Sequence, residues 1–148
     1  MINYLIYRIF DMIGIILIIF LIYNIIKDYK ERKNRSIQKK PWGEEELLFE
    51  RWEAYQNNPT RVKLLRINAR ESISKQYHNN KVEMLVCLKG TGIFEMNGII
   101  NSYEQGFRIF VDTKDIHRIT AYTDSEFIEL SNGHQEDIIR VEDDYGRV

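Results

Sequence analysis

Residues 74–92 read SKQYHNNKVEMLVCLKGTG, and they hold the side chains on which the prediction of the fold depends. Gln76 and His78 are two positions apart, so both project from the same face if this segment is a β-strand. Glu83 begins the next alternation of polar and apolar residues, from which its carboxyl group can reach the same point. The spacing therefore predicts that polar side chains from two neighbouring strands converge inside a β-domain.

Segments on both sides of this stretch have the length and the two-residue period of strands. They are 61–68, 82–89, 92–96, 107–111, 116–122 and 126–130. Asn97-Gly98 predicts a tight hairpin, because both turn positions favour positive φ. Residues 42–55 are expected to include one helical turn. Short strands at regular spacing indicate an antiparallel sandwich or barrel, and a jelly roll protects the exposed strand edges of so small a domain.

A second cluster follows the first and consists of Gly106, Asp112 and His117. Together, the two clusters match the two motifs of the cupin superfamily. The whole of residues 40–147 resembles the C-terminal cupin domain of type II mannose-6-phosphate isomerases. The resemblance begins at KPWG (40–43), passes through the two clusters, and ends in EDIIRVEDDYGR (136–147), which is similar to the characteristic ending of that family.

This resemblance implies an all-β cupin jelly roll over residues 41–148 that holds one divalent metal ion. The ligands of the family fall on Gln76, His78, Glu83 and His117. Zinc is the favoured metal. Manganese, cobalt and iron stay alternatives, because a mixed nitrogen and oxygen donor set does not choose among these metals. The resemblance assigns no catalytic base.

The implied activity is interconversion of mannose 6-phosphate and fructose 6-phosphate in sugar-nucleotide or polysaccharide precursor metabolism. Arg118, Arg140 and Arg147 are candidates for binding the phosphate, because an arginine fork matches phosphate geometry. Each also has a simpler explanation. Arg118 follows a ligand on the same strand and should point away from it, while Arg140 and Arg147 lie among acids and can form surface ion pairs.

The chain also departs from the family pattern. NNK (79–81) stands where the family has His-His-Arg, Met84-Leu85 where it has His-Trp, and DTK (112–114) where it has Pro-Ala-Gly. These departures favour an alternative function, a non-catalytic cupin that binds a sugar phosphate or scaffolds a membrane assembly. A dioxygenase or epimerase is a further alternative, which the family-like ending disfavours.

The N-terminal segment has a different composition. Residues 1–26 are almost wholly apolar, with Arg8 and Asp11 as the only charges, and they predict a single transmembrane anchor helix. Residues 27–40 carry seven Lys or Arg against two acids and predict a basic juxtamembrane linker. This basic flank predicts that the cupin domain lies on the cytosolic side. The alternative is an amphipathic or core helix of a soluble protein.

Charge and cysteine content limit the partners. Residues 41–148 carry thirteen basic against nineteen acidic side chains, which argues against nucleic-acid binding. Cys87 is the single cysteine, and its apolar surroundings predict a buried residue. Trp42 and Trp52 are expected in the core and His134 on the surface. The expected partners are a sugar phosphate, the membrane and, from the resemblance, a second copy in a homodimer.

Overall fold

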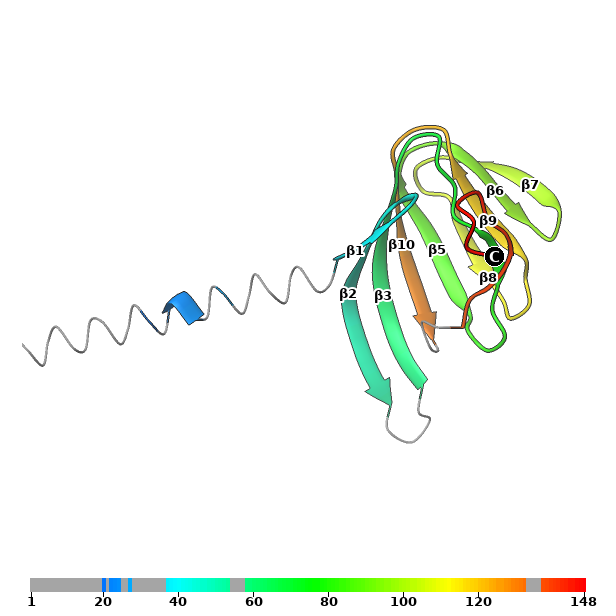
Figure 1. Ribbon diagram of the computed structural model, residues 1–148. Helices are drawn as coiled ribbons and strands as arrows, with labels where there is room; N and C mark the ends of the chain where they lie inside the picture. Colours follow the sequence, from blue (N-terminus) through cyan, green and yellow to red (C-terminus); the bar gives the residue numbers. More distant parts are fainter. Residues whose placement is uncertain (1–19, 21, 25–26, 28–36, 54–57, 133–136) are drawn as a thin grey trace, which may run out of the picture. The chain divides into compact units, whose positions relative to one another are not determined.

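A computed structural model describes residues 20, 22–24, 27, 37–53, 58–132 and 137–148. Residues 37–148 form one compact unit, and residues 1–36 form another. The larger unit is built from antiparallel strands that form two sheets (Figure 1). The strands are β1 (Ile37–Lys40), β2 (Gly43–Glu53), β3 (Asn58–Ile67), β4 (Lys75–Tyr77), β5 (Glu83–Lys89), β6 (Gly92–Met96), β7 (Ile99–Tyr103), β8 (Arg108–Val111), β9 (His117–Ala121), β10 (Ser125–Asn132) and β11 (Ile139–Glu142).

The chain passes several times from one sheet to the other. The six-stranded sheet has the order β1-β2-β3-β10-β5-β8, and the five-stranded sheet has the order β11-β4-β9-β6-β7. Several pairs of strands that are adjacent in sequence, such as β4 and β5, therefore lie in different sheets. This arrangement confirms the predicted all-β class.

All six segments predicted as strands are strands, namely β3, β5, β6, β8, β9 and β10. The predicted hairpin is confirmed as well, since Asn97 and Gly98 have φ of 51° and 81° and Met96 pairs with Ile99. The helical turn expected in residues 42–55 is wrong. Residues 43–53 form β2, which pairs with β3 along its length, with a bulge between Leu47 and Phe49.

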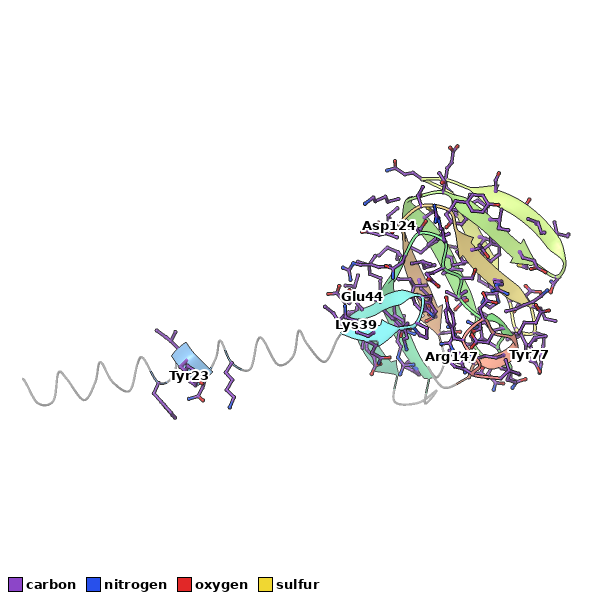
Figure 2. The ribbon with its side chains drawn as sticks, turned by 45° about the horizontal axis from the view of Figure 1, so that its top comes forward. Tyr23, Lys39, Glu44, Tyr77, Asp124 and Arg147 are labelled. Carbon is purple, nitrogen blue, oxygen red and sulfur yellow. The ribbon has the colours of Figure 1, made fainter. Side chains whose placement is uncertain are left out.

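Strand β1 occupies the last four residues of the segment predicted to be a linker. It pairs with β2, and Lys39 forms an ion pair with Glu44 across this hairpin (Figure 2). At another edge of the domain, Asp124 accepts a hydrogen bond from the backbone N–H of Ala69 at 2.8 Å (Figure 2).

The apolar core draws side chains from both sheets. Its most deeply buried members include Ile67, Leu85, Phe94, Ile119 and Phe127. Trp42 and Cys87 belong to the same core, as predicted. The side chain of Trp52 and the whole of His134 lie outside the described residues.

The predicted transmembrane helix, residues 1–26, lies almost wholly outside the described residues. Phe20, residues 22–24 and Lys27 are described and are helical. Within the part of the chain that the structure describes, no helix is both long enough and apolar enough to span a bilayer. The anchor therefore stays a prediction from the sequence.

Candidate metal centre and adjoining cavity

Three of the four predicted ligands meet in the interior. His78 follows β4, His117 begins β9 and Glu83 begins β5, and all three side chains are buried. One donor atom from each lies within 4.8 Å of the other two. The two imidazole rings are 5.4 Å apart between centroids. The cluster joins the two sheets, because β9 and β5 belong to different sheets.

Each imidazole is oriented by a backbone carbonyl. The Nδ1 atom of His78 is hydrogen bonded to the carbonyl oxygen of Asp137, and Nδ1 of His117 lies 2.9 Å from the carbonyl oxygen of Asp115. A carbonyl oxygen only accepts, so both Nδ1 atoms carry the proton. In the neutral ring, the lone pair is then on Nε2, which is the atom available to bind a metal.

The two Nε2 atoms point toward Glu83. His117 Nε2 lies 3.0 Å from Glu83 Oε1, and His78 Nε2 lies 3.6 Å from Glu83 Oε2. Both Nε2 atoms are fully buried and make no hydrogen bond that meets the geometric criteria for one. Buried nitrogen atoms without a partner are costly, and two of them beside a carboxylate are a donor set that a cation would satisfy. His78, Glu83 and His117 therefore fit a divalent metal ion.

Burial alone would raise the pKa of Glu83. In the metal-free protein, contacts with the protonated rings of His117 and His78 and the charge of Lys81 outweigh burial, and the pKa lies well below its ordinary value. Glu83 is thus anionic, as a metal ligand must be.

Gln76, the fourth predicted ligand, lies on β4 directly opposite His117 in the pairing register. Its side-chain oxygen accepts a hydrogen bond from Ser74 Oγ at 2.6 Å. The side chain lines a cavity that also reaches Glu83. Coordination by Gln76 stays a prediction, since its amide oxygen is engaged by Ser74.

A chain of alternating charges leads away from Glu83 through the interior. Lys81 Nζ lies 2.5 Å from Glu83 Oε2 and 3.0 Å from Glu129 Oε1. Lys63 Nζ lies 3.7 Å from Glu129 Oε1 and 3.1 Å from Glu45 Oε1. We call Glu45, Lys63, Glu129, Lys81 and Glu83 the charge ladder, in which Glu45 is partly exposed and the other four are buried. Although burial disfavours its ammonium form, Glu129 and Glu83 raise the pKa of Lys81 above its ordinary value.

The ladder forms one wall of a cavity of about 60 Å³. Apolar side chains, among them Trp42, Leu65 and Ile119, form other parts of its lining. Arg140 and Arg147 line it as well, and Arg118 does not. The lining of the cavity therefore combines apolar surface with charged groups. Glu83 belongs both to this lining and to the cluster of possible metal ligands.

The three arginines predicted to bind phosphate are in different situations. Arg118 forms an ion pair with Asp144. Arg147 is bound by Asp143 through Nε at 2.9 Å and Nη2 at 2.5 Å. Arg140 forms no ion pair with any residue that the structure describes, and its buried Nε has no hydrogen-bond partner there. Phosphate binding stays a prediction for all three, and among them only the charge of Arg140 has no acidic partner in the described part of the chain.

Asp137 is a structural part of the site that the sequence analysis did not single out. Its carboxylate accepts the backbone N–H groups of Asn79 at 3.1 Å, Asn80 at 2.6 Å and Lys81 at 3.0 Å. Burial opposes ionisation, but these bonds lower the pKa of Asp137. Because its carbonyl also orients His78, Asp137 fixes the loop between two ligands. The signal was its position in the family-like ending.

Comparison with solved structures defines the class of the domain. The capsular polysaccharide assembling protein CapF from Staphylococcus aureus aligns with a TM-score of 0.60 at 15% identity, over 72% of this chain and 31% of that chain. KdgF from Halomonas sp. aligns with a TM-score of 0.58 at 12% identity, over 68% and 88%. An RmlC-like cupin from Shewanella frigidimarina aligns with 0.56 at 13% identity, over 68% and 86%. The domain therefore has the fold of a cupin, as predicted.

The sequence then identifies the family. Residues 27–143 match the family described as mannose-6-phosphate isomerase C-terminal, and the chain belongs to that family. A search of curated proteins found no match. The chain spans about a third of the length of CapF.

Proposed function

We propose that this cupin binds one divalent metal ion through His78, Glu83 and His117, and that it interconverts mannose 6-phosphate and fructose 6-phosphate. The observation that supports the metal is the pair of buried Nε2 atoms directed at Glu83. Family membership supports the substrate class. The position of Arg140 on the adjoining cavity supports a ligand that carries an anionic group.

When bound, a divalent cation supplies Lewis acidity for polarising a carbonyl group and its neighbouring hydroxyl. The residues of the chain would do the rest. The guanidinium of Arg140 would bind the phosphate, and the apolar wall near Trp42 would exclude water from the reacting carbons. A proton moving between C1 and C2 requires a carrier, and the carboxylate oxygens of Glu129 and Glu45 are the candidates that line the cavity.

The test uses the full chain in mild detergent, loaded in turn with zinc, manganese, cobalt and iron. Close to one ion per chain is expected, and the double variant His117→Ala and Glu83→Ala should hold none. The loaded protein should convert mannose 6-phosphate to fructose 6-phosphate, and a chelator should stop it. A wild-type protein that binds none of the four metals would contradict the proposal.

Arg140→Met tests the phosphate contact. Because a hydrogen bond to a charged group contributes about 1.5–3 kcal/mol, affinity for the sugar phosphate should fall about tenfold or more. Arg118→Met is the matched comparison, since Arg118 does not line the cavity. Equal losses in the two variants would argue against phosphate binding by Arg140.

A specific observation favours a second candidate function, a non-catalytic domain that binds a sugar phosphate. The carboxylates of Glu129 and Glu45 are each paired with a buried lysine, so an ammonium group already occupies an oxygen that would have to accept the proton of the substrate. Under this alternative, calorimetry should detect binding of mannose 6-phosphate by the metal-loaded protein without turnover. Turnover at a rate that falls when Glu129 is replaced by glutamine would favour the isomerase.

We also propose that residues 1–26 anchor the protein in a membrane with the cupin domain in the cytosol. The apolar composition of this segment and the basic residues after it support the proposal. The protein should then resist carbonate extraction from membranes, and a reporter fused after Val148 should be cytosolic. Release by carbonate would contradict the anchor, and a reporter outside the cell would contradict the orientation.

A further inference from the structure

A second hollow, of about 610 Å³, lies at the surface and away from the metal ligands. The described residues that line it are all different from those that line the cavity beside Glu83. In the pairing of β6 with β9, Gly92 and Ala121 stand at the end where this hollow lies, and Met96 and His117 stand at the other end. Four residues of strand separate the two ends, a distance of about 14 Å. The hollow is therefore a separate feature, which the proposed function does not use.

Part of the lining is aromatic and is held in place by contacts with the core. Tyr103 is buried, and its hydroxyl group donates a hydrogen bond to Ser125 Oγ at 2.9 Å. The ring of Phe107 lies 6.2 Å from the ring of Tyr103 between centroids. On its other side, Tyr103 packs edge to face against Phe127 at 4.9 Å. These contacts fix the shape of the apolar part of the hollow before any ligand binds.

Tyr122 also lines the hollow, and 59% of its surface is exposed. Its backbone N–H donates to the carbonyl oxygen of Thr91 at 2.8 Å, and the N–H of Thr123 donates to the same oxygen at 3.3 Å. The N–H of Thr91 in turn donates to Thr123 Oγ1 at 3.0 Å. A tyrosine ring on a backbone that is held in this way offers a flat apolar face to a ligand at a low cost in conformational entropy.

The polar part of the lining comes from the end of β7 and the turn that follows it. Ser102, Glu104 and Gln105 are exposed, and their side chains make no hydrogen bond or ion pair with any residue that the structure describes. The turn itself is fixed, because the N–H of Gly106 donates to the carbonyl oxygen of Cys87 at 2.9 Å. A hydroxyl group, a carboxylate and an amide without partners thus border the same hollow as the exposed tyrosine.

The charge and size of the hollow select among ligands. Among the described residues that line it, Glu104 is the charged one, and none is Lys or Arg. A phosphate group binds best to cationic donors, so the lining disfavours a sugar phosphate. A pyranose ring has C–H bonds on its faces and hydroxyl groups along its edge, which matches an aromatic face bordered by polar side chains. The volume lies within the range of small-molecule sites, roughly 300–1,000 Å³.

We propose that this hollow is a second binding site, for a hexose ring that carries no phosphate. The ring packs on Tyr122, and its hydroxyl groups form hydrogen bonds with Ser102, Glu104 and Gln105. A free monosaccharide and the end of a saccharide chain present the same chemistry, and the experiment below distinguishes them. The site is independent of the metal and of isomerase activity, because it shares no described lining residue with the cavity beside Glu83.

Saturation-transfer NMR on the full chain, in a detergent without a sugar head group, tests the site. The probes are the methyl α-glycosides of mannose and glucose, each compared with its disaccharide, α-mannobiose or maltose. Irradiation of aromatic protons should transfer saturation to the ring protons of at least one probe, because the sugar lies on Tyr122. Dissociation constants in the millimolar range are expected. Tighter binding of a disaccharide would assign the site to the end of a saccharide chain, and equal binding would assign it to a single sugar.

Variants of exposed side chains locate the bound sugar. Tyr122→Ala should weaken binding about tenfold or more, since truncation of a central aromatic contact has a large effect, and Tyr122→Phe should preserve binding. Glu104→Ala should weaken binding about fivefold, through the loss of hydrogen bonds to the sugar. Phe110→Ala is the matched control, because Phe110 is a comparably exposed aromatic residue, at 52%, that does not line the hollow. Thermal unfolding of all four variants should match that of the native chain.

The proposal fails when none of the probes binds at millimolar concentration, or when Tyr122→Ala binds them as tightly as Phe110→Ala. It also fails when the double variant His117→Ala and Glu83→Ala loses binding while Tyr122→Ala keeps it, because the sugar would then lie beside the metal ligands. Binding that persists in this double variant, together with a native protein that shows no isomerase turnover, would support the second site and refute the enzyme.

Discussion

The orientation of the two histidine rings explains why a bound cation would satisfy this site. Their Nδ1 atoms are hydrogen bonded to the backbone carbonyls of Asp137 and Asp115, and these bonds fix the orientation of both rings. Their Nε2 atoms are left beside the carboxylate of Glu83 in a region without solvent access. A protein gains nothing in stability from such a cluster unless protons or a metal ion complete it.

The charge of Lys81 would compete with a metal ion for Glu83, because Lys81 Nζ lies 2.5 Å from Glu83 Oε2. In Lys81→Met, Glu83 and Glu129 stay buried with one cation fewer, and the metal-free protein should lose about 3 kcal/mol of stability in urea unfolding. A bound divalent ion would compensate Glu83 directly. We therefore expect cobalt to raise the melting temperature more in Lys81→Met than in the native protein.

Lys89→Met is the control, because Lys89 is exposed at the end of β5. It should change neither the stability nor the response to cobalt. An unchanged melting temperature of metal-free Lys81→Met would show that the ladder contributes nothing to the fold. A smaller response to cobalt in that variant would show that Lys81 assists metal binding rather than opposing it.

At the scale of elements, sequence patterns located the strands better than they located the inside and the outside. The period of two in β3 was visible, but Lys63 points into the barrel and Leu64 away from it, because the interior contains paired charges. Strand β2 was missed because Leu47, Leu48 and Phe49 follow one another in the sequence, which breaks the alternation, and the bulge at this point accommodates the extra residue. Pairing with β3 overrides the helical preference of its glutamates.

Some residues of the candidate site were predicted from the sequence, and others were not. His78, Glu83 and His117 were predicted from the resemblance to the family's two motifs, and the structure brings the three side chains together from the starts or ends of three strands. The ladder partners Lys63 and Glu129 were not predicted, since charged residues on strands are normally solvent-facing. The two residues are direct partners in the pairing of β3 with β10, and side chains of the other sheet complete the cavity that encloses them.

Two of the glycines in the turns between strands differ in their surroundings. Gly90, between β5 and β6, has φ of 100°, and an added Cβ would lie 2.6 Å from Ser125 Cα. Gly98, in the β6–β7 hairpin, has φ of 81°, and nothing lies near an added Cβ. Gly90→Ala should therefore cost about 3 kcal/mol or more, through strain and overlap, while Gly98→Ala should cost about 1 kcal/mol, through strain alone.

Urea unfolding of the two variants measures this difference. Gly98→Asn is the internal control, because asparagine tolerates positive φ and should cost less than alanine at the same position. Equal losses of unfolding free energy for Gly90→Ala and Gly98→Ala would mean that the backbone near Ser125 moves aside to make room for the added Cβ. The close approach of β10 to the end of β5 would then contribute little to the stability of the barrel.

Across the whole molecule, the C-terminal segment completes the site that the earlier strands begin. Strand β11 pairs with β4, which precedes His78, and Arg140 lies opposite Gln76 in this register. Asp137, just before β11, holds the loop of residues 79–81. Tyr145, just after it, donates to Glu71 at 2.6 Å. Loss of the C-terminal segment should therefore affect the ligand loop as well as the cavity wall.

The attachment of this segment should depend on pH through Asp143. The bonds from Arg147 outweigh burial and lower the pKa of Asp143 from 3.8 to about 2. A carboxyl group with a lower pKa in the folded protein stabilises it fully above its unfolded pKa, and this stabilisation is lost as the pH falls through the folded pKa. The native protein should therefore lose stability between pH 4 and pH 2 more steeply than Asp143→Asn. Urea unfolding at several pH values measures both slopes, with Glu104→Gln as a control for an exposed carboxylate on the same domain. Parallel slopes for the native protein and Asp143→Asn would contradict the prediction, and the C-terminal turn would then be held by its other contacts, those of Tyr145 among them.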